Sequence, residues 1–230
     1  MSSSTHTDPT AAGSAEVEPA LLASADSVGS LHTGPIPADA AIWLVRHGET
    51  EWSRTGKHTG RTDVPLTPRG EQQAAALAPM FADLQPSLVL SSPRVRATRT
   101  AELAGLTVDG IDEDLSEWDY GDYEGLTTPQ IRETVPGWTL WTHFVPNGDS
   151  PASVAKRADR VLGRAMDAIS RGPVVLVAHG HICRVIGARW IGLTALDGGK
   201  FTLGTAAPSL LGSEHGTPVI TGWNYPNPAR

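Results

Sequence analysis

The sequence predicts an α/β protein of three layers, in which a mostly parallel, doubly wound sheet carries helices on both faces. Short apolar runs of strand length alternate along the chain with longer segments of helical periodicity. Two of the runs, 41–45 and 174–178, are apolar throughout, as interior parallel strands are when both of their faces are buried. Strands that alternate with helices indicate βαβ units and therefore a parallel sheet covered on both sides.

The individual elements can be assigned in order along the chain. The predicted strands are short apolar runs bounded by polar residues or glycine: 41–45, 87–91, 106–108, 174–178, 209–212 and 219–223. The predicted helices begin at a Ser or Thr cap followed by proline, or show apolar residues at helical spacing: 68–84, 93–104, 128–134, 151–169 and 180–191. Over 112–148, aromatic residues are scattered among glycines and acids, so we expect an irregular region with short helical pieces.

Composition limits the classes of partner. The chain of 230 residues carries 18 basic and 25 acidic residues, which gives a net charge of −7. This balance argues against nucleic acid or an anionic membrane as the main partner. A single cysteine, Cys183, excludes an internal disulfide framework and a cysteine-based zinc site. No apolar run approaches the roughly 20 residues that a membrane-spanning helix needs.

The chain is expected to form one domain between two tails. Residues 1–39 include no lysine or arginine and are rich in Ser, Thr, Ala, Gly and Pro. We therefore expect a disordered N-terminal tail over 1–40, a domain over 41–224 and a C-terminal tail over 225–230. A secretory signal or a transit peptide would need basic residues in the first segment, so we expect a cytoplasmic protein. The sequence leaves open whether it forms a homo-oligomer.

Two of the predicted strands end in a histidine that is followed by glycine. His47 follows the strand at 41–45, directly after Arg46, and His179 follows the strand at 174–178. Adjacent parallel strands would bring both histidines to the same edge of the sheet, where open α/β sheets bind their ligands. We therefore expect the functional site at this edge.

Two further segments supply charged side chains of complementary kinds. The strand at 87–91 leads into a helix with Arg94, Arg96 and Arg99 in its first turns, and helix N-termini and arginines both favour phosphate. Glu117 lies among aromatic residues, an environment that can raise the pKa of a carboxyl group and keep a proton available.

These residues fit a phosphoryl-transfer site. His47 would attack phosphorus in line, Glu117 would protonate the leaving oxygen, and the three equatorial oxygens would be held by Arg46, Arg96 and His179. Water would then hydrolyse the phosphohistidine with Glu117 acting as base. Because the first step needs a protonated Glu117, an acidic pH optimum is expected.

The same histidines and acids could also be imagined as metal ligands. Arg46 and Arg96 beside the site would oppose the binding of a cation. We therefore expect no metal and no cofactor.

Four motifs give the chain a recognisable family pattern. They occur in order as LVRHGETEWSRTGKHTGRTDVPLTPRGEQQA, SSPRVRATRTAELA, LSEWDYGDYEGLT and VAHGHICRVIGARW. Over residues 42–223 the chain resembles the histidine phosphatase superfamily, in its phosphoglycerate-mutase-like branch. Within it, the chain is most similar to actinobacterial acid phosphatases and the fungal sedoheptulose-bisphosphatase-like group.

The resemblance implies roles for individual residues. His47 is implied to be the phosphorylated nucleophile and Glu117 the proton donor, with Arg46, Arg96 and His179 forming the phosphate pocket. Arg96 is favoured over the two neighbouring arginines because it occupies the family position before Ala-Thr-x-Thr.

The substrate-binding residues are less strongly indicated. The candidates for this role are Ser53, Thr59, Gly60 and Gly180. Many relatives carry Trp-Asn and then Gln-Gly in the first loop, whereas this chain has serine and threonine at those points, which can still donate hydrogen bonds with a shorter reach. His58 and His143 are candidates for the mouth of the site, and His181 is as consistent with the pocket as with solvent.

The superfamily contains phosphatases and phosphoglycerate mutases, so the fold alone leaves the reaction open. A mutase grips a second acidic group with extra cations, and the short stretch 125–150 contains Arg132 as its only lysine or arginine. This favours a phosphomonoester hydrolase of the acid phosphatase type that acts on small phosphorylated metabolites, with sugar phosphates as candidates. The alternatives are a mutase, a non-catalytic phosphate-binding module and a phosphatase of protein phosphohistidine.

Overall fold

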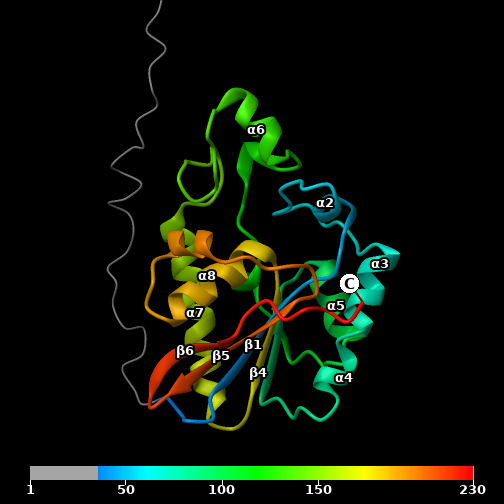
Figure 1. The fold of residues 1–230 in the computed structure, drawn as a ribbon, viewed down its shortest axis with the longest axis vertical. Helices are drawn as coiled ribbons and strands as arrows, with labels where there is room; N and C mark the ends of the chain where they lie inside the picture. Colours follow the sequence, from blue (N-terminus) through cyan, green and yellow to red (C-terminus); the bar gives the residue numbers. More distant parts are fainter. Residues whose placement is uncertain (1–35, 230) are drawn as a thin grey trace, which may run out of the picture.

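The computed structural model describes residues 36–229 and places them in three layers (Figure 1). The central sheet has the strand order β3-β2-β4-β1-β5-β6. Its strands are β1 (Ala41–Arg46), β2 (Leu88–Ser91), β3 (Gly110–Ile111), β4 (Val174–Ala178), β5 (Pro208–Glu214) and β6 (Thr217–Gly222). The first four pair in parallel and the last two are antiparallel, so the predicted mostly parallel α/β sheet is confirmed.

Helices cover both faces of this sheet, as predicted. The α-helices are α2 (Glu51–Arg54), α3 (Pro68–Ala75), α4 (Ala78–Phe81), α5 (Val95–Leu103), α6 (Thr128–Thr134), α7 (Pro151–Ile169) and α8 (Gly180–Trp190). Three short 3₁₀ helices complete the set: η1 (Glu113–Leu115), η2 (Gly121–Tyr123) and η3 (Ala195–Lys200). The bounds of α6 and α7 agree with the predicted 128–134 and 151–169.

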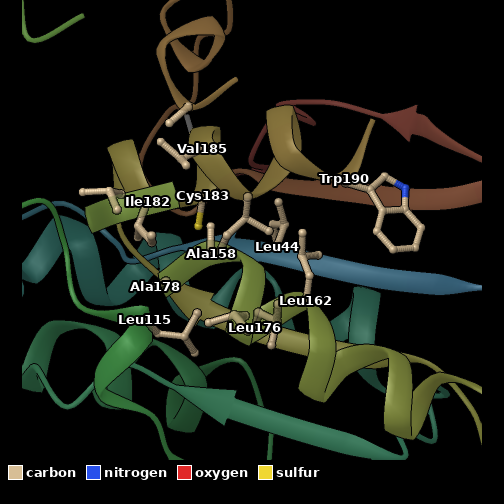
Figure 2. Packing of buried hydrophobic residues seen from close by; sticks show 14 of the residues in the cluster. Leu44, Leu115, Ala158, Leu162, Leu176, Ala178, Ile182, Cys183, Val185 and Trp190 are labelled. Atoms are coloured by element: carbon tan, nitrogen blue, oxygen red, sulfur yellow. The ribbon is translucent and has the colours of Figure 1, made fainter. Parts of the chain in front are cut away.

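Two hydrophobic cores separate the layers. Leu44 and Leu176 point from the sheet towards α7 and α8, where they pack with Leu162 and Cys183 (Figure 2). On the opposite face Val45 and its neighbours form a second core with residues of α4 and α5. Successive side chains of a strand point to opposite faces of the sheet, so neighbouring residues such as Leu44 and Val45 pack against different helices.

The pairing of β1 with β4 positions the site. Arg46 lies opposite Ala178 in this parallel register, so the residues that follow both strands leave the sheet at the same edge. The backbone N–H of His47 donates to the carbonyl of Ala178 at 2.9 Å, which extends the pairing to the first site residue. The expectation of adjacent strand ends is confirmed.

The predicted helix 68–84 is wrong in its continuity, since it is divided into α3 and α4. Pro79 has no N–H for the carbonyl of Ala75, and its ring crowds that carbonyl, so α3 ends at Ala75. Two more predicted bounds are wrong.

The strand predicted at 106–108 is found at Gly110–Ile111. The backbone N–H of Leu106 instead donates to the carbonyl of Ala101, in the hydrogen-bonded turn that ends α5. The helix predicted from 93 begins at Val95.

The predicted tails fall mostly at the edges of the described chain. Residues 1–35 and 230 lie outside it. Ile36 is buried in the core beside α7, and the side chain of Asn227 donates to the carbonyls of Gln73 and Ala206. Within residues 36–229, no helix combines the length and apolar character needed to cross a membrane.

Candidate active site

A cavity of about 240 Å³ lies at the sheet edge where β1 and β4 end. The irregular region that carries α6 lies above this edge of the sheet (Figure 1) and contributes Thr128 to the lining. The cavity is lined by residues from the strand ends, the first loop, the irregular region and α8: Arg46, His47, Ser53, Gly56, Lys57, His58, Thr59, Glu117, Tyr120, Thr128, Gly180, His181, Arg184 and Leu203.

His47 is held in one tautomer at the wall of the cavity. Its Nδ1 lies 2.7 Å from the carbonyl oxygen of Gly48, which can only accept, so Nδ1 carries the proton and Nε2 keeps its lone pair. Burial, followed by the charges of Arg96 and Arg46, lowers the pKa of His47 to about 3. The ring is therefore neutral at ordinary pH, as a nucleophile must be.

Arg46 brings a fixed positive charge beside this ring. Its Nη1 donates to the carbonyl of Leu203, in the segment before β5. The guanidinium also lies against Gly180, where an added Cβ would stand 3.3 Å from Cζ of Arg46. A side chain at position 180 would therefore make a tight contact with the guanidinium and require it to shift slightly.

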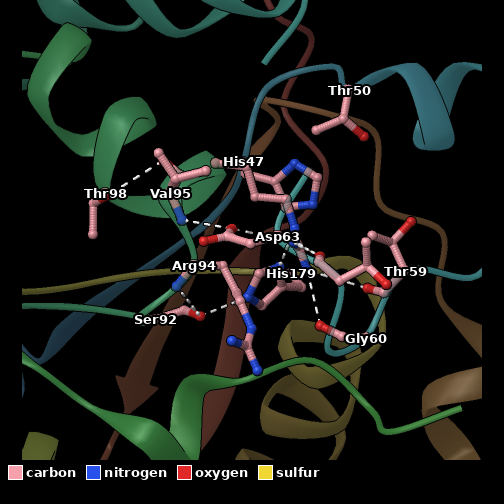
Figure 3. A network of polar contacts seen from close by, with 12 residues as sticks. His47, Thr50, Thr59, Gly60, Asp63, Ser92, Arg94, Val95, Thr98 and His179 are labelled. Atoms are coloured by element: carbon pink, nitrogen blue, oxygen red, sulfur yellow. Dashed lines mark hydrogen bonds and ion pairs between the residues drawn. The ribbon is translucent and has the colours of Figure 1, made fainter. Parts of the chain in front are cut away.

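Arg96 and His179 form a buried pair behind His47, and neither lines the cavity. Nε of Arg96 donates to Nδ1 of His179 at 3.1 Å, so Nε2 of His179 carries the proton. This Nε2 donates to the Ser92 hydroxyl at 2.7 Å (Figure 3). The rings of His47 and His179 are 5.2 Å apart between centroids. Burial, then the charge of Arg96, lowers the pKa of His179, which is therefore neutral.

The rest of the Arg96 guanidinium anchors the first loop. It donates to the carbonyl oxygens of Thr59, Gly60 and Thr62. Arg96 thus joins the loop to the second histidine, and its fully buried charge lies 4.0 Å from the carboxylate of Asp63. The neighbouring Arg94 and Arg99 differ from it, since neither is fully buried.

Glu117 accepts three backbone N–H groups. Oε1 accepts from Trp118 and Ile182, and Oε2 accepts from His181, each at 2.9 Å. Its carboxylate therefore lies at the N-terminus of α8, where negative charge is stabilised. Burial alone would raise the pKa of Glu117, but its interactions with the side chain and the backbone N–H of His181 lower it well below its usual range. The predicted raised pKa is thus wrong, because the aromatic sequence context does not reveal the N–H groups of α8.

Two charged residues that sequence reasoning missed hold these loops in place. Arg157 of α7 donates to the carbonyls of Ser116 and Glu117 and to the carboxylate of Asp149. Glu124 accepts the backbone N–H groups of Gly60 and Thr62. In the sequence, Glu124 is visible only as one of several acidic residues in the EWDYGDYEG segment, and nothing there indicates which groups it binds.

The four predicted substrate-binding residues fall into two groups. Ser53, Thr59 and Gly180 line the cavity, whereas Gly60 lies behind it, with its backbone committed to Arg96 and Glu124. The Ser53 hydroxyl donates to the carbonyl of Thr50 within the cap of α2. The Thr59 hydroxyl donates to the carbonyl of Lys57.

Of the three histidines considered for the mouth of the site, two line the cavity and one does not. His58 and His181 line the cavity, with their rings stacked at 6.4 Å. The hydroxyl of Tyr120 is 2.6 Å from Nδ1 of His181. His143 does not line the cavity and hydrogen-bonds to Thr142 in its own turn. Cys183 is a free cysteine buried in the core.

Comparison with known proteins gives this arrangement a family. A sequence profile described as the histidine phosphatase superfamily (branch 1) matches residues 42–226. An acid phosphatase of Mycobacterium tuberculosis (strain ATCC 25618 / H37Rv) is 47% identical over 177 residues, which cover 76% of this chain and 87% of the relative. A sedoheptulose 1,7-bisphosphatase of Saccharomyces cerevisiae (strain ATCC 204508 / S288c) is 33% identical over 181 residues, 65% of this chain and 67% of the relative.

A solved structure shares the fold as well as the sequence. The structure of open reading frame Rv3214 from Mycobacterium tuberculosis superposes with a TM-score of 0.79 at 43% identity, and covers 82% of this chain and 98% of its own. The sequence match, the shared fold and the two histidines at one sheet edge agree. The chain is a histidine phosphatase and belongs to branch 1 of the histidine phosphatase superfamily.

Proposed function

We propose that this enzyme hydrolyses phosphate monoesters of small phosphorylated metabolites, sugar phosphates among them, through a phosphohistidine on His47. The observation that carries the proposal is the protonation of His47, whose Nδ1 donates to Gly48 and whose Nε2 keeps its lone pair beside Arg46. A cavity of about 240 Å³ suits a ligand smaller than the drug-sized molecules that fill roughly 300–1,000 Å³. The yeast relative is, by name, a phosphatase of a sugar bisphosphate.

The reaction has two half-steps. In the first, Nε2 of His47 attacks phosphorus, the P–O ester bond breaks, and the leaving oxygen takes a proton from Glu117. In the second, water attacks the phosphohistidine, its proton passes to the Glu117 carboxylate, and the P–N bond breaks to release inorganic phosphate. The second half-step frees Nε2 of His47 and returns a proton to Glu117, so both groups regain the states in which they entered the first.

Some of the groups expected to bind the phosphoryl oxygens line the cavity, whereas others lie behind its wall. Arg46 lines the cavity and would bind them directly, together with the backbone N–H of Gly180, which donates to no other group within residues 36–229. His179 would complete the pocket behind the His47 ring. Arg96, which bonds His179, then acts as a positioning residue and as a fixed charge that favours the negative transition state.

The proton for the leaving group would arrive with the substrate. Glu117 is ionised in the free enzyme because its pKa is lowered well below the usual range. A phosphate monoester has a second pKa near 6, so at acidic pH it binds as the monoanion and can pass its proton to Glu117. An acidic optimum is therefore expected from the titration of the substrate rather than from that of Glu117.

Hydrolysis of p-nitrophenyl phosphate by the purified chain tests the proposal. His47→Asn is expected to abolish turnover, while His143→Asn, outside the cavity, serves as the control. Glu117→Gln is expected to accumulate a labelled phosphoenzyme from ³²P-labelled substrate, seen on an alkaline gel because phosphohistidine is labile in acid. Full activity of His47→Asn would overturn the mechanism.

A further inference from the structure

A short backbone segment of the first loop, residues 59–62, lies between two opposite charges from distant parts of the chain. On one side, the Arg96 guanidinium donates to three of its carbonyl oxygens, those of Thr59, Gly60 and Thr62. On the other side, the Glu124 carboxylate accepts the backbone N–H groups of Gly60 and Thr62 at 2.9 to 3.0 Å. The segment therefore presents carbonyls to the cation and N–H groups to the carboxylate.

The peptide bond between Thr59 and Gly60 connects the two charges directly. It is trans, so its C=O and N–H point in opposite directions. The C=O of Thr59 accepts from Nη2 of Arg96 at 3.2 Å, and the N–H of Gly60 donates to Oε2 of Glu124 at 2.9 Å. The dipole of this peptide is thus aligned between the charges. Each of the two hydrogen bonds polarises the peptide in the direction that strengthens the other.

Gly60 permits this arrangement because it has no side chain. A Cβ at this position would lie 2.6 Å from the carbonyl oxygen of Trp118 and 3.0 Å from Oε2 of Glu124. The backbone of the first loop therefore packs directly on the segment that carries Glu117. The packing of the loop between its two partners thus requires a glycine at 60.

The same guanidinium determines the tautomer of the second histidine. Nε of Arg96 donates to Nδ1 of His179 at 3.1 Å, which leaves the ring proton on Nε2. Both Nη atoms of Arg96 donate to the loop carbonyls, so the position of the loop fixes the plane of the guanidinium. A guanidinium free to rotate would no longer hold a donor at Nδ1, and either nitrogen of His179 could then carry the proton.

Asp63 is the alternative partner for the buried charge of Arg96. Its carboxylate lies 4.0 Å from Nη1, beyond hydrogen-bond distance, and its side chain is 48% exposed. It also accepts the backbone N–H of Val95 at the start of α5. Solvent screens an ion pair of this kind, whereas Glu124 is connected to Arg96 by hydrogen bonds through the loop.

We propose that Glu124 is a positioning residue for Arg96 and His179. Its carboxylate holds the first loop against the guanidinium, and the guanidinium in turn holds His179 with its proton on Nε2. Glu124 itself does not line the cavity. The expected effect on turnover rests on the proposed function, because that function assigns His179 to the phosphate pocket. The expected effect on the tautomer of His179 does not depend on it.

The tautomer of His179 provides a test without turnover. Long-range ¹H–¹⁵N spectra of the ¹⁵N-histidine-labelled protein distinguish protonated from unprotonated ring nitrogens, and His179→Asn identifies the signals of this ring. The wild type is expected to carry the proton on Nε2, and Glu124→Ala a mixture of both tautomers. Asp122→Asn, which removes the same charge from an exposed contact with Asn147, should keep the wild-type spectrum. An unchanged His179 spectrum in folded Glu124→Ala would overturn the proposal.

Turnover of p-nitrophenyl phosphate tests the consequence for catalysis. Glu124→Ala is expected to lower kcat by about 10- to 100-fold and to change KM less, because Glu124 lies outside the cavity lining. Glu124→Gln keeps one acceptor oxygen and should lose less, while Asp122→Asn should keep kcat. Asp63→Asn tests the alternative partner. A loss in that variant as large as in Glu124→Ala would show that Arg96 needs a nearby charge rather than a fixed loop, and would overturn the proposal.

The outcome is separable from failure of the proposed function. If the wild type does not hydrolyse p-nitrophenyl phosphate, the proposed function fails, and the His179 spectrum of Glu124→Ala still decides the positioning role. If Glu124→Ala does not fold, Glu124→Gln takes its place in both experiments. A wild-type His179 spectrum together with a wild-type kcat in Glu124→Gln would then overturn the proposal.

Discussion

The backbone N–H of His181 donates to Oε2 of Glu117 at 2.9 Å, while Nδ1 of the same histidine lies 3.7 Å from that oxygen. One residue therefore acts on the carboxylate twice, through its position at the start of α8 and through its ring. Against the effect of burial, both interactions lower the pKa of Glu117. They favour the ionised carboxylate, which is the form that accepts a proton from water in the second half-step.

Removal of the His181 ring should shift the pH profile. In His181→Ala the backbone hydrogen bond remains but the ring does not, so the pKa of Glu117 rises. In the enzyme–substrate complex the proton that arrives with the substrate is shared with Glu117, so a more basic Glu117 keeps this proton in the complex to higher pH. The basic limb of the kcat profile for an alkyl phosphate should therefore move upwards. His143→Ala is the matched control, since that ring does not line the cavity. An unchanged limb would show that the His181 ring does not govern Glu117.

The role of Glu117 as a proton donor predicts a dependence on the leaving group. Glu117→Gln keeps the shape of the side chain but cannot donate a proton from a carboxyl group. General acid catalysis contributes about 10²- to 10⁴-fold, so kcat/KM for glycerol 3-phosphate should fall by that order. The loss for p-nitrophenyl phosphate should be much smaller, because p-nitrophenolate leaves without protonation. Equal losses on both substrates would contradict the assignment.

Much of this site could be predicted because it depends on the ends of regular strands. The sequence shows one apolar run followed by Arg46 and His47 and another followed by His179. Parallel pairing of the two strands then brings these residues to the same edge of the sheet. The inner location of Arg96 and His179 could not be predicted, because it depends on a hydrogen bond between residues of two different layers.

The pKa values and charge pairs of the site could not be predicted from the sequence either, because they also depend on contacts between distant segments. Aromatic neighbours suggested a raised pKa for Glu117, but three backbone N–H groups, two of them from α8, reverse the direction. Similarly, Arg96 and Glu124 belong to distant segments that are connected only when the first loop lies between them. Pro79 is visible in the sequence, but the helical periodicity on both sides of it predicts one continuous helix.

The lowered pKa of His47 predicts how stability depends on pH. The folded value of about 3 lies below the ordinary value of 6.5, so the unfolded state binds more protons between these values. Stability is therefore full above pH 6.5 and falls as the pH is lowered towards 3, by about 1.4 kcal/mol per pH unit from this group. Urea unfolding at pH 6.5 and 5 should show a loss about 2 kcal/mol smaller in His47→Asn. An equal loss in both proteins would mean that His47 titrates normally.

Arg157 is expected to act on catalysis through the position of Glu117. Arg157→Lys keeps the charge but loses the fork that binds the Ser116 and Glu117 carbonyls. A displaced acid should lower kcat by about 10- to 100-fold and change KM less, because Arg157 does not line the cavity. Arg160→Gln, which breaks an ion pair of α7 with Asp114, is the control and should change kcat little. A loss confined to KM would contradict the positioning role.

Gly48 is expected to tolerate no side chain, because the loop after β1 packs backbone to backbone. A Cβ there would lie 2.3 Å from the carbonyl oxygen of Gly70, at the start of α3. Gly48→Ala should therefore cost about 1–3 kcal/mol of unfolding free energy and lower kcat, because the Gly48 carbonyl fixes the His47 tautomer. Gly163→Ala is the matched control: nothing lies within 4 Å of its Cβ on α7, so helix propensity should add up to about 1 kcal/mol. Opposite signs in denaturant unfolding would confirm that close backbone packing, rather than the loss of a glycine as such, destabilises the first variant.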